Sequence, residues 1–193
     1  MKNIFAAGLL LALTAMMSAS GAGSALQARE KIIPAGRNVA FAIISQWPDY
    51  SRELAGIIID EYGAPDEVEP SQLTWMASPP WRKVTVFRDP VSAQHPALLL
   101  RAVSYRVPFE RWRALVAFGH GIDYDPVNEQ LSARTDNEET NYLALNLADD
   151  VVRGQLSALE AAEFYDRTMS LLYAGKTTSY TTKLHFPTSS YIF

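Results

Sequence analysis

Cysteine is absent from this sequence. Without it the chain cannot form disulfide bonds, cysteine-type zinc sites or thiol nucleophiles, and no cysteine is available near the N-terminus to carry a lipid anchor. The fold must therefore be stable through side-chain packing and hydrogen bonding alone.

Basic residues are also in short supply, with 17 lysines and arginines against 21 aspartates and glutamates. No basic stripe is present, so we expect no nucleic-acid partner. Hydrophobic residues make up 48% and charged residues 20% of the chain, values typical of a globular protein. Only one long apolar run occurs, at the N-terminus, so we expect the rest of the chain to be soluble and to lack a membrane span.

The motifs of several common enzyme classes are missing as well. The sequence contains no Gly-x-Ser-x-Gly, no Gly-x-Gly-x-x-Gly, no Walker loop and no His-Glu-x-x-His. The three histidines have no recognisable catalytic spacing to a partner residue. We therefore expect no cofactor, and the sequence favours a binding role over catalysis.

Residues 1–28 have the three-part layout of a secretory signal peptide. Lys2 supplies the positive charge, an uncharged apolar stretch covers residues 4–17, and small residues fill positions 18–25. This apolar stretch is shorter than the ~20 residues that a helix needs to cross a bilayer, which favours cleavage over a permanent anchor. We expect cleavage between residues 20 and 28 and an exported protein, periplasmic or secreted.

The remaining chain is predicted to form a single α+β domain over residues 29–176, followed by a C-terminal tail over residues 177–193. Alternating or apolar segments predict strands over residues 73–76, 82–88 and 98–107 and a hairpin of residues 122–124 and 130–135. Apolar residues three and four apart predict helices over residues 51–62 and 109–118. Residues 39–44 fit either a helix or a buried strand, because a short apolar run does not distinguish the two.

Two capping boxes in the C-terminal third, Asp136-x-x-Glu139 and Ser157-x-x-Glu160, predict two helices separated by a short break at Gly154. The first of these helices carries a broad stripe of Ala, Leu and Val, which must face a core. These elements predict an α+β fold with a mainly antiparallel sheet of about five strands, helices on one face, and a C-terminal αα-hairpin.

His120, Asp123 and Asp125 are the candidate metal ligands. Imidazole and carboxylate groups bind zinc and other transition ions, and carboxylates alone bind calcium. Their spacing matches no metal-binding loop that we can name. In the alternative interpretation, the aspartates lie on the solvent side of a hairpin whose turn begins at Asp125-Pro126.

Trp75 and Trp81 are the candidate binding surface, because they flank the Pro79-Pro80 turn. Two indoles on one side of a hairpin can stack on a ligand such as a glycan. The alternative is core packing, which helical spacing favours for Trp47 and Trp112.

Four segments carry a resemblance to a known family: Tyr62-Gly-Ala-Pro-Asp-Glu67, Leu73-Thr-Trp75, Leu131-Ser-Ala-Arg134 and residues 141–149, Asn-Tyr-Leu-Ala-Leu-Asn-Leu-Ala-Asp. This pattern resembles an uncharacterised family of exported bacterial proteins, whose function is not established. Residues 51–88 are more loosely similar to small outer-membrane assembly lipoproteins of the BamE type, although the lipidated cysteine of that family is missing here. That likeness implies an accessory role in envelope assembly or stress.

We therefore expect a non-catalytic periplasmic or secreted protein that binds a small molecule or an envelope protein. The first alternative is a small exported hydrolase, with or without a metal, centred on His120 and Asp123. The second is the envelope assembly or stress factor that the resemblance implies. Metal content separates the first two possibilities, and a cleft lined by aromatic residues without converging polar groups would favour binding.

Overall fold

The structure is a computed structural model that describes residues 36–93 and 96–188. The predicted signal peptide, residues 1–28, and His95 lie outside these residues. All described residues belong to one compact unit of the chain.

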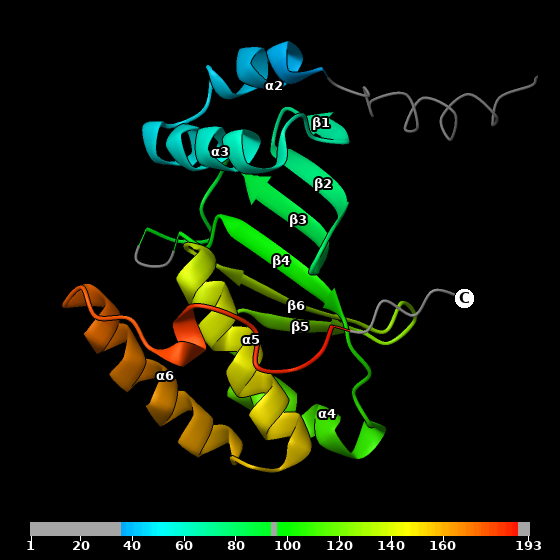
Figure 1. The fold of residues 1–193 in the computed structure, drawn as a ribbon, viewed down its shortest axis with the longest axis vertical. Helices are drawn as coiled ribbons and strands as arrows, with labels where there is room; N and C mark the ends of the chain where they lie inside the picture. Colours follow the sequence, from blue (N-terminus) through cyan, green and yellow to red (C-terminus); the bar gives the residue numbers. More distant parts are fainter. Residues whose placement is uncertain (1–35, 94–95, 189–193) are drawn as a thin grey trace, which may run out of the picture. The chain divides into compact units, whose positions relative to one another are not determined.

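A six-stranded antiparallel sheet in the order β1-β2-β3-β4-β6-β5 forms the centre of the fold (Figure 1). Its strands are β1 (Glu67–Glu69), β2 (Gln72–Ser78), β3 (Trp81–Phe87), β4 (Leu99–Ser104), β5 (Ile122–Asp125) and β6 (Gln130–Thr135). The predicted α+β class is confirmed, with one strand more than expected. Strand β1 was missed because its three residues contain a single apolar side chain, Val68, too few to show an alternation.

Five α-helices and two short 3-10 turns complete the described part of the chain. They are α2 (Arg37–Ile44), α3 (Asp49–Tyr62), η2 (Phe109–Arg111), α4 (Trp112–Phe118), α5 (Glu138–Arg153), α6 (Ala158–Tyr173) and η3 (Ser179–Thr181). The ambiguous residues 39–44 are therefore helical. Within residues 36–93 and 96–188, no helix has the length and apolar character needed to span a membrane.

The start of α6 follows the predicted capping box. Ser157 accepts a hydrogen bond from the Glu160 backbone N–H at 3.2 Å, and its own N–H donates to the Glu160 carboxylate at 2.8 Å. The capping box predicted for α5 is shifted by one residue, because Asn137 and Thr140 form it. Asp136 instead accepts the backbone N–H of Ala97 at 2.7 Å, a contact between distant segments that no local pattern predicts.

Helices α3 and α5 lie on the same face of the sheet. Buried Arg101 of β4 forms ion pairs with Glu61 of α3, which contacts β2 and β3, and with Glu138 of α5, which contacts β4 and β6. Helix α6 packs against α5 as the predicted αα-hairpin and also contacts α4. The fully buried Leu147 faces this core from α5, as the apolar stripe of that helix requires.

Residues 177–188 of the predicted C-terminal tail are held to α5. Asn146 of α5 donates hydrogen bonds to the carbonyls of Tyr180, at 3.0 Å, and Lys183, at 2.8 Å, and accepts the N–H of His185 at 2.8 Å. The side chain of Phe186 is buried in the core. Three backbone groups of this segment therefore form hydrogen bonds with one buried side-chain amide. Local composition could not reveal these contacts.

Candidate functional site

The structure does not bring the three predicted metal ligands together. The ring of His120 lies between two aromatic rings, with centroids 4.8 Å from Phe118 and 4.5 Å from Tyr165, and its Nδ1 is 2.5 Å from the Phe118 carbonyl oxygen. Among the residues described, no three metal-ligating side chains form a group that could hold an ion. The structure does not place these three candidates together as a metal site: the His120 ring packs against the rings of Phe118 and Tyr165 instead.

Asp125 stabilises the β5–β6 turn. This agrees with the alternative interpretation, in which the turn begins at Asp125-Pro126. Its carboxylate accepts the backbone N–H groups of Val127, at 2.9 Å, and Asn128, at 3.2 Å, and the Asn128 side-chain amide at 2.6 Å. The hydrogen bonds from Asn128 and Val127 lower the pKa of the Asp125 carboxyl. Asp123, two residues earlier, is exposed on β5.

Trp75 and Trp81, the candidate binding surface, are buried in the structure. Each indole is only 2% exposed, because the β2–β3 hairpin turns both rings toward the helices. The Trp75 Nε1–H donates to the Gly63 carbonyl at 3.1 Å, and the Trp81 ring lies 4.9 Å from the Arg101 guanidinium. Both tryptophans are core residues.

Arg101 is the centre of a buried ionic network that the sequence analysis missed. Its side chain is 0% exposed and forms ion pairs with Glu138 through Nη1 and with Glu61 through Nη2, the latter at 3.5 Å. Its Nε and Nη2 atoms have no hydrogen-bond acceptor among the residues described. The available signal was a single charge within the otherwise apolar stretch of residues 98–103.

Two tyrosines extend this network. Burial is the main cause that raises the pKa of Tyr62, and the hydrogen bond with Glu61 adds to it. Burial also raises the pKa of Tyr142 to about 12, with the negative charge of Glu138 as the next cause. The network connects α3, β4 and α5, and because its guanidinium is inaccessible we assign it a structural role.

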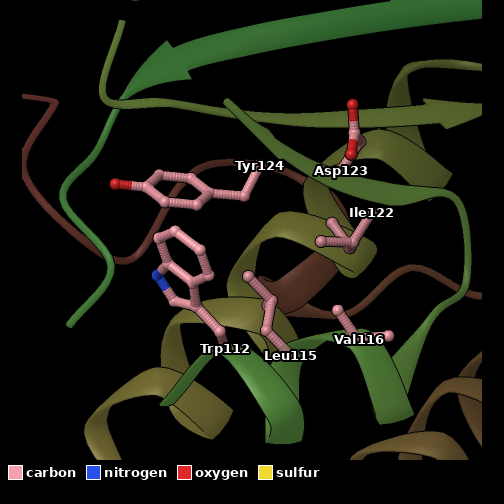
Figure 2. Close-up of a pocket in the computed structure, with 6 residues that line it drawn as sticks. All are labelled: Trp112, Leu115, Val116, Ile122, Asp123 and Tyr124. Carbon is pink, nitrogen blue, oxygen red and sulfur yellow. The ribbon is translucent and has the colours of Figure 1, made fainter. Parts of the chain in front are cut away.

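A small apolar groove lies between α4 and β5. It has a volume of about 100 Å³ and is lined by Trp112, Leu115 and Val116 of α4 and by Ile122, Asp123 and Tyr124 of β5 (Figure 2). We call this the α4–β5 groove. The Val116 side chain is 81% exposed, so the rim of the groove presents apolar surface to solvent.

Hydrogen bonds hold the aromatic end of the groove in place. The Trp112 Nε1–H donates to the Val107 carbonyl at 3.2 Å, and the Val107 N–H donates to the Tyr124 hydroxyl at 3.2 Å. The two rings meet edge to face with centroids 5.8 Å apart. The backbone N–H and carbonyl of Val107 therefore hold the Tyr124 and Trp112 rings, respectively, in place.

Gly121 allows β5 to approach β6 at the entrance of the hairpin. It has φ of 76°, and a Cβ atom at this position would lie 2.3 Å from the Arg134 carbonyl oxygen. No other residue fits here without moving the backbone. The Arg134 N–H donates to the Gly121 carbonyl at 2.8 Å, which sets the register of the hairpin.

Strand β5 is the last strand of the sheet, so one of its edges is free of other described strands. Hydrogen-bonded and non-hydrogen-bonded pairs alternate in antiparallel strands. Because Gly121 bonds to Arg134, the backbone groups of Ile122 and Tyr124 point away from β6. The Ile122 N–H donates to the Gly119 carbonyl at 2.9 Å. Among the described residues, the Tyr124 N–H and the carbonyls of Ile122 and Tyr124 therefore face the free edge without a backbone partner.

A second hollow, of about 320 Å³, lies between the start of α5 and the end of α6. Three of its polar residues already have partners, since Asn137 and Thr140 cap α5 and Asp136 accepts the backbone N–H of Ala97. The α4–β5 groove is the better candidate site, because it combines apolar walls with a free strand edge.

Comparisons with protein families, curated proteins and solved structures find no match for this chain. Its function is therefore inferred from the site itself. Sequence reasoning assigned Trp112 to a helical stripe and residues 122–124 to a hairpin, but no local signal showed that they face each other.

Proposed function

We propose that this protein is an exported, non-catalytic interaction protein that binds an extended segment of an envelope protein at the α4–β5 groove. The segment adds to the sheet as a strand beside β5, and its side chains enter the groove. Recognition of this kind takes affinity from backbone hydrogen bonds and specificity from pockets for alternate side chains. The signal-peptide layout of residues 1–28 supports the location, and an accessory role in envelope assembly is compatible with it.

One observation carries this proposal: the free edge of β5 lies directly beside an apolar groove. The Tyr124 N–H and the carbonyls of Ile122 and Tyr124 face that edge, where an added strand would satisfy them. The exposed Val116 side chain lies on the opposite wall. An apolar wall parallel to an unpaired strand edge suits an extended chain that alternates its side chains.

The size of the groove favours a peptide over a free small molecule. Pockets for small molecules usually enclose ~300–1,000 Å³, whereas this groove has about 100 Å³. That space suits one or two aliphatic side chains. The hydrolase alternative has less support, because His120 is packed between rings and does not join the two aspartates.

Fluorescence anisotropy with a labelled peptide of alternating valine and threonine tests the proposal. We expect measurable binding to the mature protein, and loss of binding when the peptide backbone is N-methylated at alternate residues. N-methylation keeps the side chains but removes the donors that strand addition requires. Equal binding of both peptides, or of neither, would contradict strand addition.

A matched pair of variants places the binding at the groove. Val116→Asp adds a charge to the apolar wall and should weaken binding by about tenfold or more, or ~1.4 kcal/mol. Leu159→Asp makes the same kind of change at an exposed position of α6, far along the chain from the groove, and should leave binding unchanged. Both sites are exposed, so circular dichroism should show intact folding in each variant.

A further inference from the structure

The two sides of strand β5 differ in chemistry. Ile122 and Tyr124 pair with Ala133 and Leu131, and they line the α4–β5 groove. Figure 2 shows the Asp123 carboxylate on the opposite side of the strand from the Ile122 and Tyr124 side chains. An extended chain beside β5 must follow the same alternation, since successive side chains of a strand point to opposite faces.

The Asp123 carboxylate forms no ion pair with any of the described residues. Its side chain is exposed. Asp125 adds a second carboxylate on the same side of the strand, two residues further on. Asp125 accepts the hydrogen bonds of the turn and has Lys83 among its charged neighbours, so Asp123 is the exposed carboxylate on this side of the strand, with apolar side chains on the other.

The geometry of strand pairing brings a partner side chain close to Asp123. Its backbone faces β6, so an added strand meets Asp123 in a non-hydrogen-bonded pair. Side chains are closest in pairs of this type, with Cα atoms ~4.5 Å apart. Opposite charges in directly facing positions stabilise a strand pair, and like charges destabilise it.

We infer that the segment bound at the α4–β5 groove has an apolar–basic–apolar sequence, with a lysine or arginine facing Asp123 and its two apolar neighbours facing α4. This inference rests on the proposed function, because it names the chemistry of the strand that adds to β5. It also explains how the edge is protected from indiscriminate pairing. The exposed Asp123 carboxylate on this short strand repels acidic strands and favours basic ones.

Two peptides that differ only in charge test the inference. The probes alternate valine with lysine or valine with glutamate, and binding is measured by fluorescence anisotropy at low and at high salt. For the unmodified protein we expect the lysine peptide to bind about tenfold more tightly at low salt, from attraction in one case and repulsion in the other. The difference should shrink at high salt, because the pair is exposed.

Charge reversal at a single position provides the decisive comparison. Asp123→Lys should invert the preference, so that the glutamate peptide binds more tightly. Glu163→Lys makes the same change in net charge at an exposed position of α6 and should leave the preference for lysine in place. Both side chains are exposed, so neither change should disturb folding.

The outcomes separate the two proposals. If neither charged peptide nor the valine–threonine peptide binds, strand addition is refuted and this inference fails with it. If both charged peptides bind equally, the groove binds strands but the apolar–basic–apolar rule is wrong. If Glu163→Lys alters the preference as much as Asp123→Lys does, overall charge accounts for the selectivity and the assignment to Asp123 is overturned.

Discussion

The side chain of Arg101 is fully buried and forms ion pairs with two glutamates. Both partners are partly exposed, with 42% of the Glu61 and 39% of the Glu138 side-chain surface accessible. We predict that Glu138→Gln is more damaging to stability than the loss of Arg101 itself. Glutamine removes the closest negative charge and leaves a buried guanidinium with only the looser Glu61 contact, at 3.5 Å.

The expected magnitude follows from the burial of each group. Removing one partner of a fully buried ion pair costs ~3–5 kcal/mol. Glu138 is partly exposed, and glutamine keeps an oxygen acceptor, so we expect the free energy of unfolding to fall by about 2 kcal/mol. Arg101→Met removes the buried charge together with its desolvation cost, and methionine fills a similar space. Its cost should be ~0–1 kcal/mol.

Urea denaturation followed by circular dichroism measures both changes as shifts in the unfolding midpoint. Adding Glu138→Gln to Arg101→Met should cost less than about 0.5 kcal/mol further, because the charge to be compensated is gone. Asp60→Asn, which breaks the exposed pair with Arg37, is the control and should have little effect. A larger loss for Arg101→Met than for Glu138→Gln would refute the argument from burial.

Three further predictions concern other parts of the chain. Asn146→Ala removes three hydrogen bonds to residues 180–185 and should lower stability by ~2–3 kcal/mol. It should also open residues 177–188 to limited proteolysis before the rest of the chain. Burial raises the pKa of Asp149 above its ordinary value of 3.8, although the Tyr105 hydrogen bond opposes this. The protonated Asp149 carboxyl thus adds to stability below the unfolded-state pKa, and this contribution is lost as the pH rises through the folded-state pKa. The stability of the unmodified protein relative to Asp149→Asn should therefore fall as the pH rises above the ordinary carboxyl pKa of 3.8, and a rise would contradict this sign. Mass spectrometry of the native protein should place its N-terminus between Gly21 and Arg29, whereas a retained Met1 would exclude cleavage.

Several elements of the fold could be predicted because their causes are local. The Ser157 and Glu160 capping box starts α6 where expected, since both groups lie within one turn of the chain. The apolar stripe of α5, with Leu147 at its centre, faces the core as its period requires. The β5–β6 hairpin and its Asp125 turn follow in the same way from turn chemistry.

Local sequence patterns could not assign the residues whose partners lie far away in the sequence. Trp75 and Trp81 flank a turn, as an exposed pair would, but the helices that cover them come from other parts of the chain. Asn146 interrupts an apolar stripe, and only the tertiary structure shows that it holds a segment more than thirty residues later. His120 meets Tyr165 of α6, which replaces the carboxylates as its neighbour.

Local patterns were enough to predict the α+β class, the capped start of α6 and the absence of disulfide chemistry. Long-range strand pairing instead sets which strand lies at the edge of the sheet. Strand β6 pairs with β4 on one side and β5 on the other, so the hairpin turns β5 outward and places its free edge beside α4. Hydrophobic periodicity records which face of a strand is buried but not which strand is its neighbour, and the candidate site depends on that neighbour.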